Sequence, residues 1–235
     1  MLQFDSLKMG KILVVAAHPD DEMLGCGGTL ARFAKMGAFV TILLLGEGPF
    51  ARSGTSEDRE GIRNDAVSSA FQAASCFEIT DVRFASFPDN KFDTIPFLDI
   101  VQFIEKESAH LSPDLVFTHH AGDLNLDHRL THLAVMTAFR PLPNFKAPAI
   151  LAFEVLSSTE YAVSGSLPAF EPTVYIDISS TLNDKQKALA CYTSEMRPYP
   201  HPRSHAIVEH LARLRGSQSG LEAAEAFILC RKVYY

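Results

Sequence analysis

Short, uninterrupted apolar runs recur along the chain, and a segment with helical spacing follows most of them. Residues 12–17 read Ile-Leu-Val-Val-Ala-Ala, and residues 39–45 read Phe-Val-Thr-Ile-Leu-Leu-Leu. Runs of this kind are typical of strands that are buried on both faces of a parallel sheet. Further strands are predicted at residues 84–87, 115–118, 149–153 and 173–178.

Helices are predicted between these strands at residues 25–36, 57–74, 95–110 and 127–140, and in the last third at 183–192, 206–214 and 221–229. This alternation predicts an α/β fold, a Rossmann-like three-layer sandwich whose mostly parallel sheet carries helices on both faces. A length of 235 residues fits one domain, so a single domain is expected over residues 1–235. In such sheets the ligand site lies beyond the carboxyl ends of the strands.

Composition narrows the class of protein and of partner. The net charge is −7 and the pI about 5.7, without a basic stripe, which argues against a nucleic-acid partner. The four cysteines are far apart and form no Cys-x-x-Cys pair, which argues against a cysteine zinc site and a disulfide framework. The apolar runs are too short to span a bilayer, and the first residues lack the pattern of a signal peptide. A cytoplasmic protein is therefore expected.

Two clusters of imidazoles and carboxylates follow predicted strands. His18, Asp20 and Asp21 come directly after the first strand, and residues 119–128 come directly after the fourth. His18 and Asp21 are three residues apart in a turn, so we expect both side chains on one side of it, with His128 as a third ligand. Two imidazoles and one carboxylate suit Zn²⁺, with Fe²⁺ or another divalent ion as the alternative.

A metal held there would allow amide hydrolysis at neutral pH. Zinc lowers the pKa of a bound water from ~15.7 to roughly 7. Asp20 points differently from the two ligands beside it, and we expect it to act as general base on the zinc-bound water and then to protonate the leaving amine. Asp127, beside His128, is expected to orient a ligand ring. Each residue alone has a plainer interpretation, as a loop histidine or a helix cap; the conjunction of the two clusters favours a metal site.

The same residues carry a family resemblance. Ala-His-Pro-Asp-Asp-Glu at 17–22, the glycine-rich stretch 24–37 and Asp-Leu-Asn-Leu-Asp-His-Arg-Leu-Thr-His at 123–132 resemble the PIG-L/LmbE-like family of zinc-dependent N-acetylglucosaminyl deacetylases. Residues 220–227 resemble the family's C-terminal Gly-x-x-x-Ala-Glu-Ala-Phe motif. The resemblance implies hydrolysis of the N-acyl, in most members N-acetyl, amide of a small amino-sugar conjugate. It also implies His18, Asp21 and His128 as metal ligands, Asp20 as base, and a homo-oligomer, a trimer or hexamer.

One position departs from the family pattern. The later motif usually reads His-Pro-Asp-His, and its first histidine helps to stabilise the oxyanion; here that position is Asn125. An asparagine donates a hydrogen bond but carries no positive charge and delivers no proton. His201, between two prolines, is a candidate to replace the missing imidazole, with a plain loop histidine as the equal alternative.

Several other residues are candidates for the substrate pocket. Arg63, with Arg52 and Arg59, follows the second strand and is a candidate to bind a phosphate or carboxylate of the substrate. Glu154 follows the fifth strand and is a candidate to bind sugar hydroxyls. His132 lies four residues after His128, as in zinc-binding histidine pairs, but a packing role behind the site is favoured. For His119 and His120 two interpretations stay open: one of them lines the pocket, or both are buried at the strand end.

Three function classes remain distinguishable. The first is the amino-sugar deacetylase. The second is a zinc amidase that acts on a non-sugar or thiol-conjugate amide, and the third is a catalytically inactive binding protein on the same scaffold. The sequence leaves the sugar, its carrier and the acyl group open.

Overall fold

The computed structural model describes residues 10–48, 59–163 and 165–234. They form a seven-stranded sheet with the order β3-β2-β1-β4-β5-β7-β6. The strands are β1 (Lys11–Ala16), β2 (Phe39–Gly46), β3 (Asp81–Phe87), β4 (Leu115–His119), β5 (Ala149–Phe153), β6 (Val174–Asp177) and β7 (Ala224–Arg231). The helices are α1 (Asp21–Lys35), α2 (Arg59–Ser75), α3 (Phe97–Ser108), α4 (Leu126–Ala138), α5 (Leu182–Leu189) and α6 (His205–Ser219), with short 3-10 turns η4 (Phe92–Thr94) and η5 (Thr159–Tyr161).

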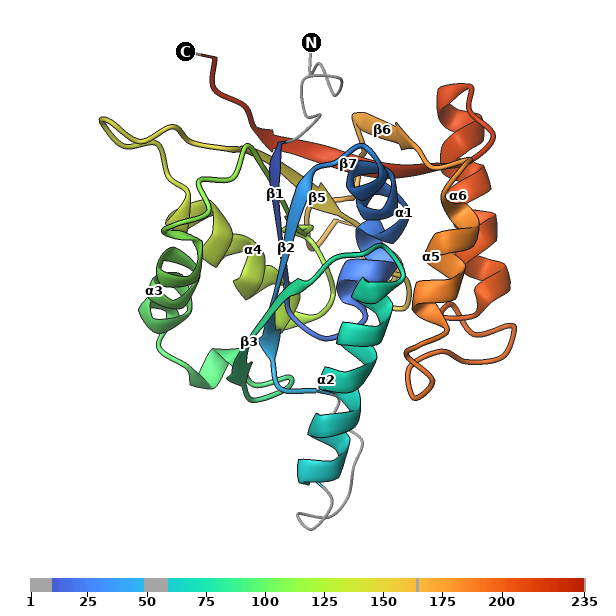
Figure 1. Cartoon of the computed structure of the whole chain (residues 1–235), viewed down its shortest axis with the longest axis horizontal. Helices are drawn as coiled ribbons and strands as arrows, with labels where there is room; N and C mark the ends of the chain where they lie inside the picture. Colours follow the sequence, from blue (N-terminus) through green and yellow to red (C-terminus); the bar gives the residue numbers. More distant parts are fainter. Residues whose placement is uncertain (1–9, 49–58, 164, 235) are drawn as a thin grey trace.

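The sheet is parallel from β3 to β5, as the unbroken apolar runs predict. Val14 of β1 pairs with Ile42 of β2 on one side and with Phe117 of β4 on the other. β7 runs antiparallel between β5 and β6. Helices α3 and α4 cover one face of the sheet, and α1, α2, α5 and α6 cover the other (Figure 1). The predicted α/β class with helices on both faces is confirmed.

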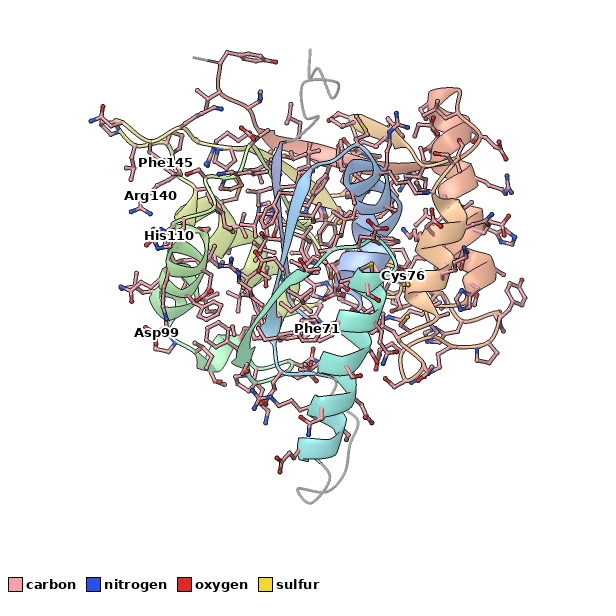
Figure 2. The ribbon with its side chains drawn as sticks, viewed as in Figure 1. Phe71, Cys76, Asp99, His110, Arg140 and Phe145 are labelled. Carbon is pink, nitrogen blue, oxygen red and sulfur yellow. The ribbon has the colours of Figure 1, made fainter. Side chains whose placement is uncertain are left out.

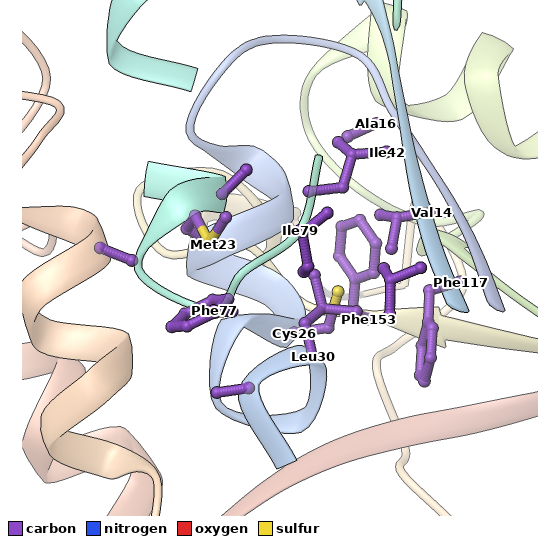
Figure 3. Close-up of a cluster of buried hydrophobic side chains, with 14 of the residues drawn as sticks. Val14, Ala16, Met23, Cys26, Leu30, Ile42, Phe77, Ile79, Phe117 and Phe153 are labelled. Carbon is purple, nitrogen blue, oxygen red and sulfur yellow. The ribbon is translucent and has the colours of Figure 1, made fainter. Parts of the chain in front are cut away.

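Each face of the sheet has its own apolar core. On the α1 side, Val14 and Ile42 of the sheet belong to one buried cluster with Met23 and Leu30 of α1 (Figure 3). On the other face, Leu13 and Val15 pack under α3 and α4. In Figure 2, Phe71 and Cys76 mark α2 on the first side, and Asp99 and Arg140 mark α3 and the end of α4 on the second. Within the described ranges, no helix is long and apolar enough to cross a membrane.

The prediction of a helix at residues 221–229 is wrong, because this stretch contributes strand β7. Alanine, leucine and glutamate favour helices by intrinsic propensity, and that preference misled the interpretation. Helix α6 ends at Gly220, whose left-handed φ of 73° reverses the chain. The segment then lies between β5 and β6, where Ala224, Ala226 and Phe227 are buried. Backbone pairing with two neighbouring strands outweighs local propensity here.

Helix α1 is broken near its middle by a contact from β7. Cys26 leaves helical geometry at φ −144° and ψ 16°, so the helix restarts with backbone N–H groups that lack an intrahelical partner. The buried carboxylate of Glu225 accepts hydrogen bonds from the N–H groups of Gly28 and Thr29, at 3.0 and 2.7 Å. Lys185 of α5 donates to Glu225 Oε1 at 2.6 Å. Lys185 also donates to the carbonyl oxygen of Leu24 at 2.7 Å, before the break, so this buried pair joins the two halves of α1, the first of which carries Asp21.

Candidate metal centre and active site

The candidate site lies where β1 and β4 end side by side. From β1 the chain continues to β2 on one side, while β4 occupies the other side, so the loops after β1 and β4 diverge over a crevice at the carboxyl edge of the sheet. His18 to Asp21 form the first loop, and residues 120–125 form the second. Pro19 is followed by Asp20 at a left-handed φ of 111°, and α1 begins at Asp21.

Side chains from the first loop, the start of α1 and the first turn of α4 converge on one point. Asp21 Oδ2 lies 3.3 Å from His18 Nδ1 and 3.2 Å from His128 Nε2. One potential ligand atom from each of the three lies within 4.8 Å of the others, close enough to share an ion. Asp21 Oδ1 is buried and has no hydrogen-bond partner in the described part of the chain. Two imidazole nitrogens and a carboxylate oxygen suit zinc with an open coordination position, so the residues fit the expected metal.

The other ring nitrogen of each of the two imidazoles lies beside a carboxylate. His18 Nε2 lies 3.1 Å from Asp127 Oδ2, and Asp127 Oδ1 accepts the N–H of Phe92 at 3.0 Å. His128 Nδ1 lies 3.2 Å from Asp123 Oδ1. Thr159 donates to Asp123 Oδ2 at 2.6 Å, and its neighbour Ser158 donates to Asp123 Oδ1. Asp127 thus supports His18 from across the site rather than its neighbour His128.

Two carboxylates at the site were missed by reasoning from sequence. Asp123 is the first residue of the later motif, and this position could have marked it as a site residue. Its spacing in the sequence alone did not link it to His128. Asp89 lies after β3, and its Oδ1 is 3.3 Å from His18 Nε2. Nothing in the sequence around residues 87–90 connects it with residue 18.

The carboxylates create a field that favours positive charge at the ligand position. Burial alone would lower the pKa of His18, but hydrogen bonds to Asp127 and Asp21 raise it well above its usual range. Burial opposes protonation of His128 as well, yet Asp21 and Asp123 raise its pKa to about 9. Burial would raise the pKa of Asp21, and the facing imidazoles of His128 and His119 hold it well below its usual value. The same negative charges would also stabilise a bound metal cation.

We expect the support of His128 by Asp123 to be measurable as metal affinity. In Asp123→Asn the ring loses its charged acceptor, so we expect the affinity for Zn²⁺ to fall by about 10- to 100-fold. Competition titration against a chromogenic chelator measures this. Asp99→Asn, an exposed change on α3, serves as the control. An unchanged affinity in Asp123→Asn would show that the carboxylate does not tune the ligand.

Asp20 is buried beside the ligands but points to a different partner. Its Oδ2 accepts a hydrogen bond from Arg203 at 2.6 Å, and its Oδ1 has no hydrogen-bond partner among the described residues. Its N–H donates to Glu22 Oε2 at 3.0 Å, and Tyr192 donates to the other oxygen of Glu22. Burial raises the pKa of Asp20 well above its usual value, although Arg203 opposes the shift. The left-handed backbone of Asp20 is the kind of strain that is held in place at functional sites.

A cavity of about 430 Å³ opens over these residues. That volume lies within the range of small-molecule sites, ~300–1,000 Å³. Its walls come from the two loops, from α2, and from residues 157–158 and 194–203. The lining residues are His18, Pro19, Asp20, Ile62, Asp65, Asp89, Asn90, Asn125, His128, Ser157, Ser158, Ser194, Glu195, Arg197 and Arg203.

The structure brings some of the other sequence candidates to this cavity and not others. Asn125 lines it: its Oδ1 caps α4 by accepting the N–H of Asp127 at 2.8 Å, and its Nδ2 donates to Asn90 at 3.1 Å. His201 is half-buried, accepts the N–H of Arg203 on Nδ1, and is not among the lining residues.

Two proposed substrate-binding residues lie outside the cavity lining. Arg63 donates to Ser86 at 2.5 Å. Glu154 forms a two-pronged ion pair with Arg215, at 2.6 and 2.7 Å, and lines a separate small hollow. Arg52 lies outside the described residues.

The remaining histidines near the site are engaged in packing. His119 Nε2 accepts the N–H of Ala17 at 2.8 Å, and its ring stacks on His128 with centroids 3.9 Å apart. His132 lies 2.8 Å from the carbonyl oxygen of His119. His120 lies 2.8 Å from the carbonyl oxygen of Pro168. His119 therefore packs against the ring of His128, and His132 packs behind the site.

Comparison with known sequences points to one family of enzymes. The PIG-L family model, described as GlcNAc-PI de-N-acetylase, matches residues 13–139. An Escherichia coli (strain K12) protein named uncharacterized deacetylase YaiS is 30% identical over 155 residues, which cover 63% of this chain and 75% of that protein. A Bacillus cereus protein named probable N-acetyl-alpha-D-glucosaminyl L-malate deacetylase 2 is 28% identical over 190 residues, covering 78% of this chain and 83% of that protein.

Solved structures share the fold. The N,N'-diacetylchitobiose deacetylase of Pyrococcus horikoshii has a TM-score of 0.78 at 20% identity and covers 97% of this chain and 86% of its own. GalB, the 4-carboxy-2-hydroxymuconate hydratase of Pseudomonas putida KT2440, has a TM-score of 0.77 at 20% identity, covering 97% and 98%. A deacetylase and a hydratase thus share this architecture, so the fold alone does not fix the reaction. The sequence match over more than half of the chain is the stronger finding, and it shows that the chain belongs to the PIG-L family.

Proposed function

We propose that the protein is a zinc-dependent deacylase that hydrolyses the N-acyl amide, in the first place the N-acetyl amide, of an amino-sugar conjugate. One observation carries this proposal: His18 and His128, which converge on Asp21, line the same cavity as the carboxylate of Asp20. The named deacetylases of N-acetylglucosamine conjugates among the relatives support the same reaction class.

His18, Asp21 and His128 would hold the metal. Zinc bound there would supply Lewis acidity and lower the pKa of a water to roughly 7. The protein's part is to keep the ligand rings in one tautomer and orientation, which Asp127 and Asp123 do through the far nitrogens of His18 and His128.

Asp20 is proposed as the general base. Its Oδ1 has no hydrogen-bond partner in the described chain, so it is available to take a proton from the attacking water and to return it to the leaving nitrogen. Its Oδ2 is held by Arg203, which fixes the carboxylate in orientation. Burial raises the pKa of Asp20, and a raised pKa makes a carboxylate a stronger base.

The developing oxyanion needs a donor on the opposite side of the amide. Asn125 is proposed for this role, because it lines the cavity and its Nδ2 carries two hydrogens, of which the bond to Asn90 uses one. A catalytic role of His201 stays a prediction. From the loop that carries it, Arg203 is the residue that contacts Asp20.

Release of primary amine by the purified protein tests the proposal. A panel of N-acetylglucosamine conjugates, matched non-sugar acetamides and thiol-conjugate amides is incubated with protein of measured metal content. We expect about one metal ion per chain and amine release from the sugar conjugates. Release from the non-sugar or thiol-conjugate amides alone would favour the amidase alternative. Full metal content without hydrolysis of any amide would favour the inactive binding protein.

A further inference from the structure

The outer wall of the cavity carries two arginines on one short loop. Arg197 and Arg203 both line the cavity, and the N–H of Arg197 donates to the carbonyl oxygen of Arg203 at 3.1 Å. The N–H of His201 donates to the carbonyl oxygen of Pro198 at 3.1 Å, which closes the loop further. The two guanidinium groups are therefore held on the same side of the site.

The two arginines differ in how their charge is balanced. Arg203 donates to Asp20 at 2.6 Å, to Glu195 at 3.0 Å and to Ser157 at 2.7 Å. Arg197 donates through Nη1 to the carbonyl oxygens of Ser194 and Met196. Across the described chain it has no carboxylate partner, and no hydrogen bond engages its Nε or Nη2.

The carboxylates of the cavity do not neutralise Arg197. Asp20 and Glu195 face Arg203, and Asp89 lies beside His18. Asp65, on α2, is exposed to water, which screens its charge. Arg197 is half-buried, so it has given up part of its hydration while several of its donors are not used by the protein. A guanidinium in this state suits a planar or tetrahedral oxyanion, which it binds through two parallel N–H groups.

We propose that Arg197 selects the substrate by binding a carboxylate or phosphate on the carrier part of the conjugate. The inference rests on the proposed function, because it assumes that the acetamide occupies the inner end of the cavity beside Asp20. The substrate class is then an anionic amino-sugar conjugate, and Arg197 takes the role that the sequence suggested for Arg63, whose guanidinium is bound to Ser86.

Matched substrate pairs test this selection. One pair is an N-acetylglucosamine conjugate with a free carboxylate and its methyl ester, and the other is a phosphate monoester and its neutral alcohol. We expect the wild type to show a kcat/KM about 10-fold or more higher for the anionic member of at least one pair. The pair with the larger ratio identifies carboxylate or phosphate as the group bound. In Arg197→Gln the ratio should fall to about 1 because kcat/KM falls for the anionic member, and Arg197→Lys should keep part of the preference.

A control variant and a binding measurement distinguish failure of this inference from failure of the proposed function. Arg213→Gln removes the same charge from an exposed pair on α6 and should leave the ratio unchanged. Equal rates on both members of each pair in the wild type, or an equal loss on both in Arg197→Gln, would overturn the inference. If the protein hydrolyses none of the conjugates, their binding affinities are measured by calorimetry instead. A preference for the anion that Arg197→Gln removes would then uphold this inference while the proposed function fails, and equal binding would overturn it.

Discussion

Replacement of Asp20 by Asn is expected to lower kcat for amide hydrolysis by about 10²- to 10⁴-fold while stoichiometric metal stays bound. The amide cannot take up a proton from water, but it has nearly the size of the carboxylate and tolerates a positive φ better than most residues. Arg203 keeps its second partner, Glu195, so the wall of the cavity stays in place. Amine release and metal content are measured on the same preparation.

Asp114→Asn is the matched control for this variant. Asp114 lies before β4 and pairs with Lys146 at the surface, outside the cavity. Wild-type activity in Asp20→Asn would remove Asp20 from the reaction. Loss of metal from Asp20→Asn would show that residue 20 is part of the ligand set, against the division of roles proposed here.

Replacement of Lys185 by Met is expected to reduce the free energy of unfolding by about 3–5 kcal/mol. The change leaves Glu225 buried without its cation, although the N–H groups of Gly28 and Thr29 still donate to it. The side chains of Lys185 and Glu225 are each only 5% exposed, so water cannot replace the lost charge. Urea denaturation followed by circular dichroism measures the difference.

Two further variants identify the cause of that loss. Lys187→Met lies on the same helix with its side chain 73% exposed, and a change within about 0.5 kcal/mol is expected. In the double variant Lys185→Met with Glu225→Gln the uncompensated charge is gone, so part of the stability should return. A Lys185→Met protein as stable as the wild type would mean that the pair does not hold α1.

The sequence predicted those parts of the molecule that depend on local pattern. The apolar runs at 12–17 and 39–45 form central strands. A strand that is buried on both faces carries apolar side chains on both, so its sequence does not alternate between polar and apolar residues. The cluster of His18, Asp21 and His128 was within reach of sequence because each residue directly follows or soon follows a strand end. The rule that parallel strands present their carboxyl ends at one edge then brings the three side chains together.

The parts that were missed depend on contacts across long sequence separations. Asp20 and Arg203 are joined by an ion pair, and no spacing rule connects residues so far apart. The same holds for Glu225 and the break in α1 at Cys26, since a strand near the end of the chain sets the geometry of the first helix. The oligomeric state, the cytoplasmic location and the single-domain organisation stay predictions.

The candidate metal ligands and the outer wall of the cavity come from different parts of the fold, and this separation affects how related proteins diversify. The candidate metal ligands follow the central strands β1 and β4, whereas α2 and the loop 194–203 contribute the outer wall of the cavity. Glu195 and Arg203 of that loop hold Asp20 in place, but exchanges at its other positions can alter which molecule is accepted without changing the candidate ligands. Proteins that descend from one ancestral hydrolase could thus keep the same reaction and bind different substrates through substitutions in a ten-residue segment.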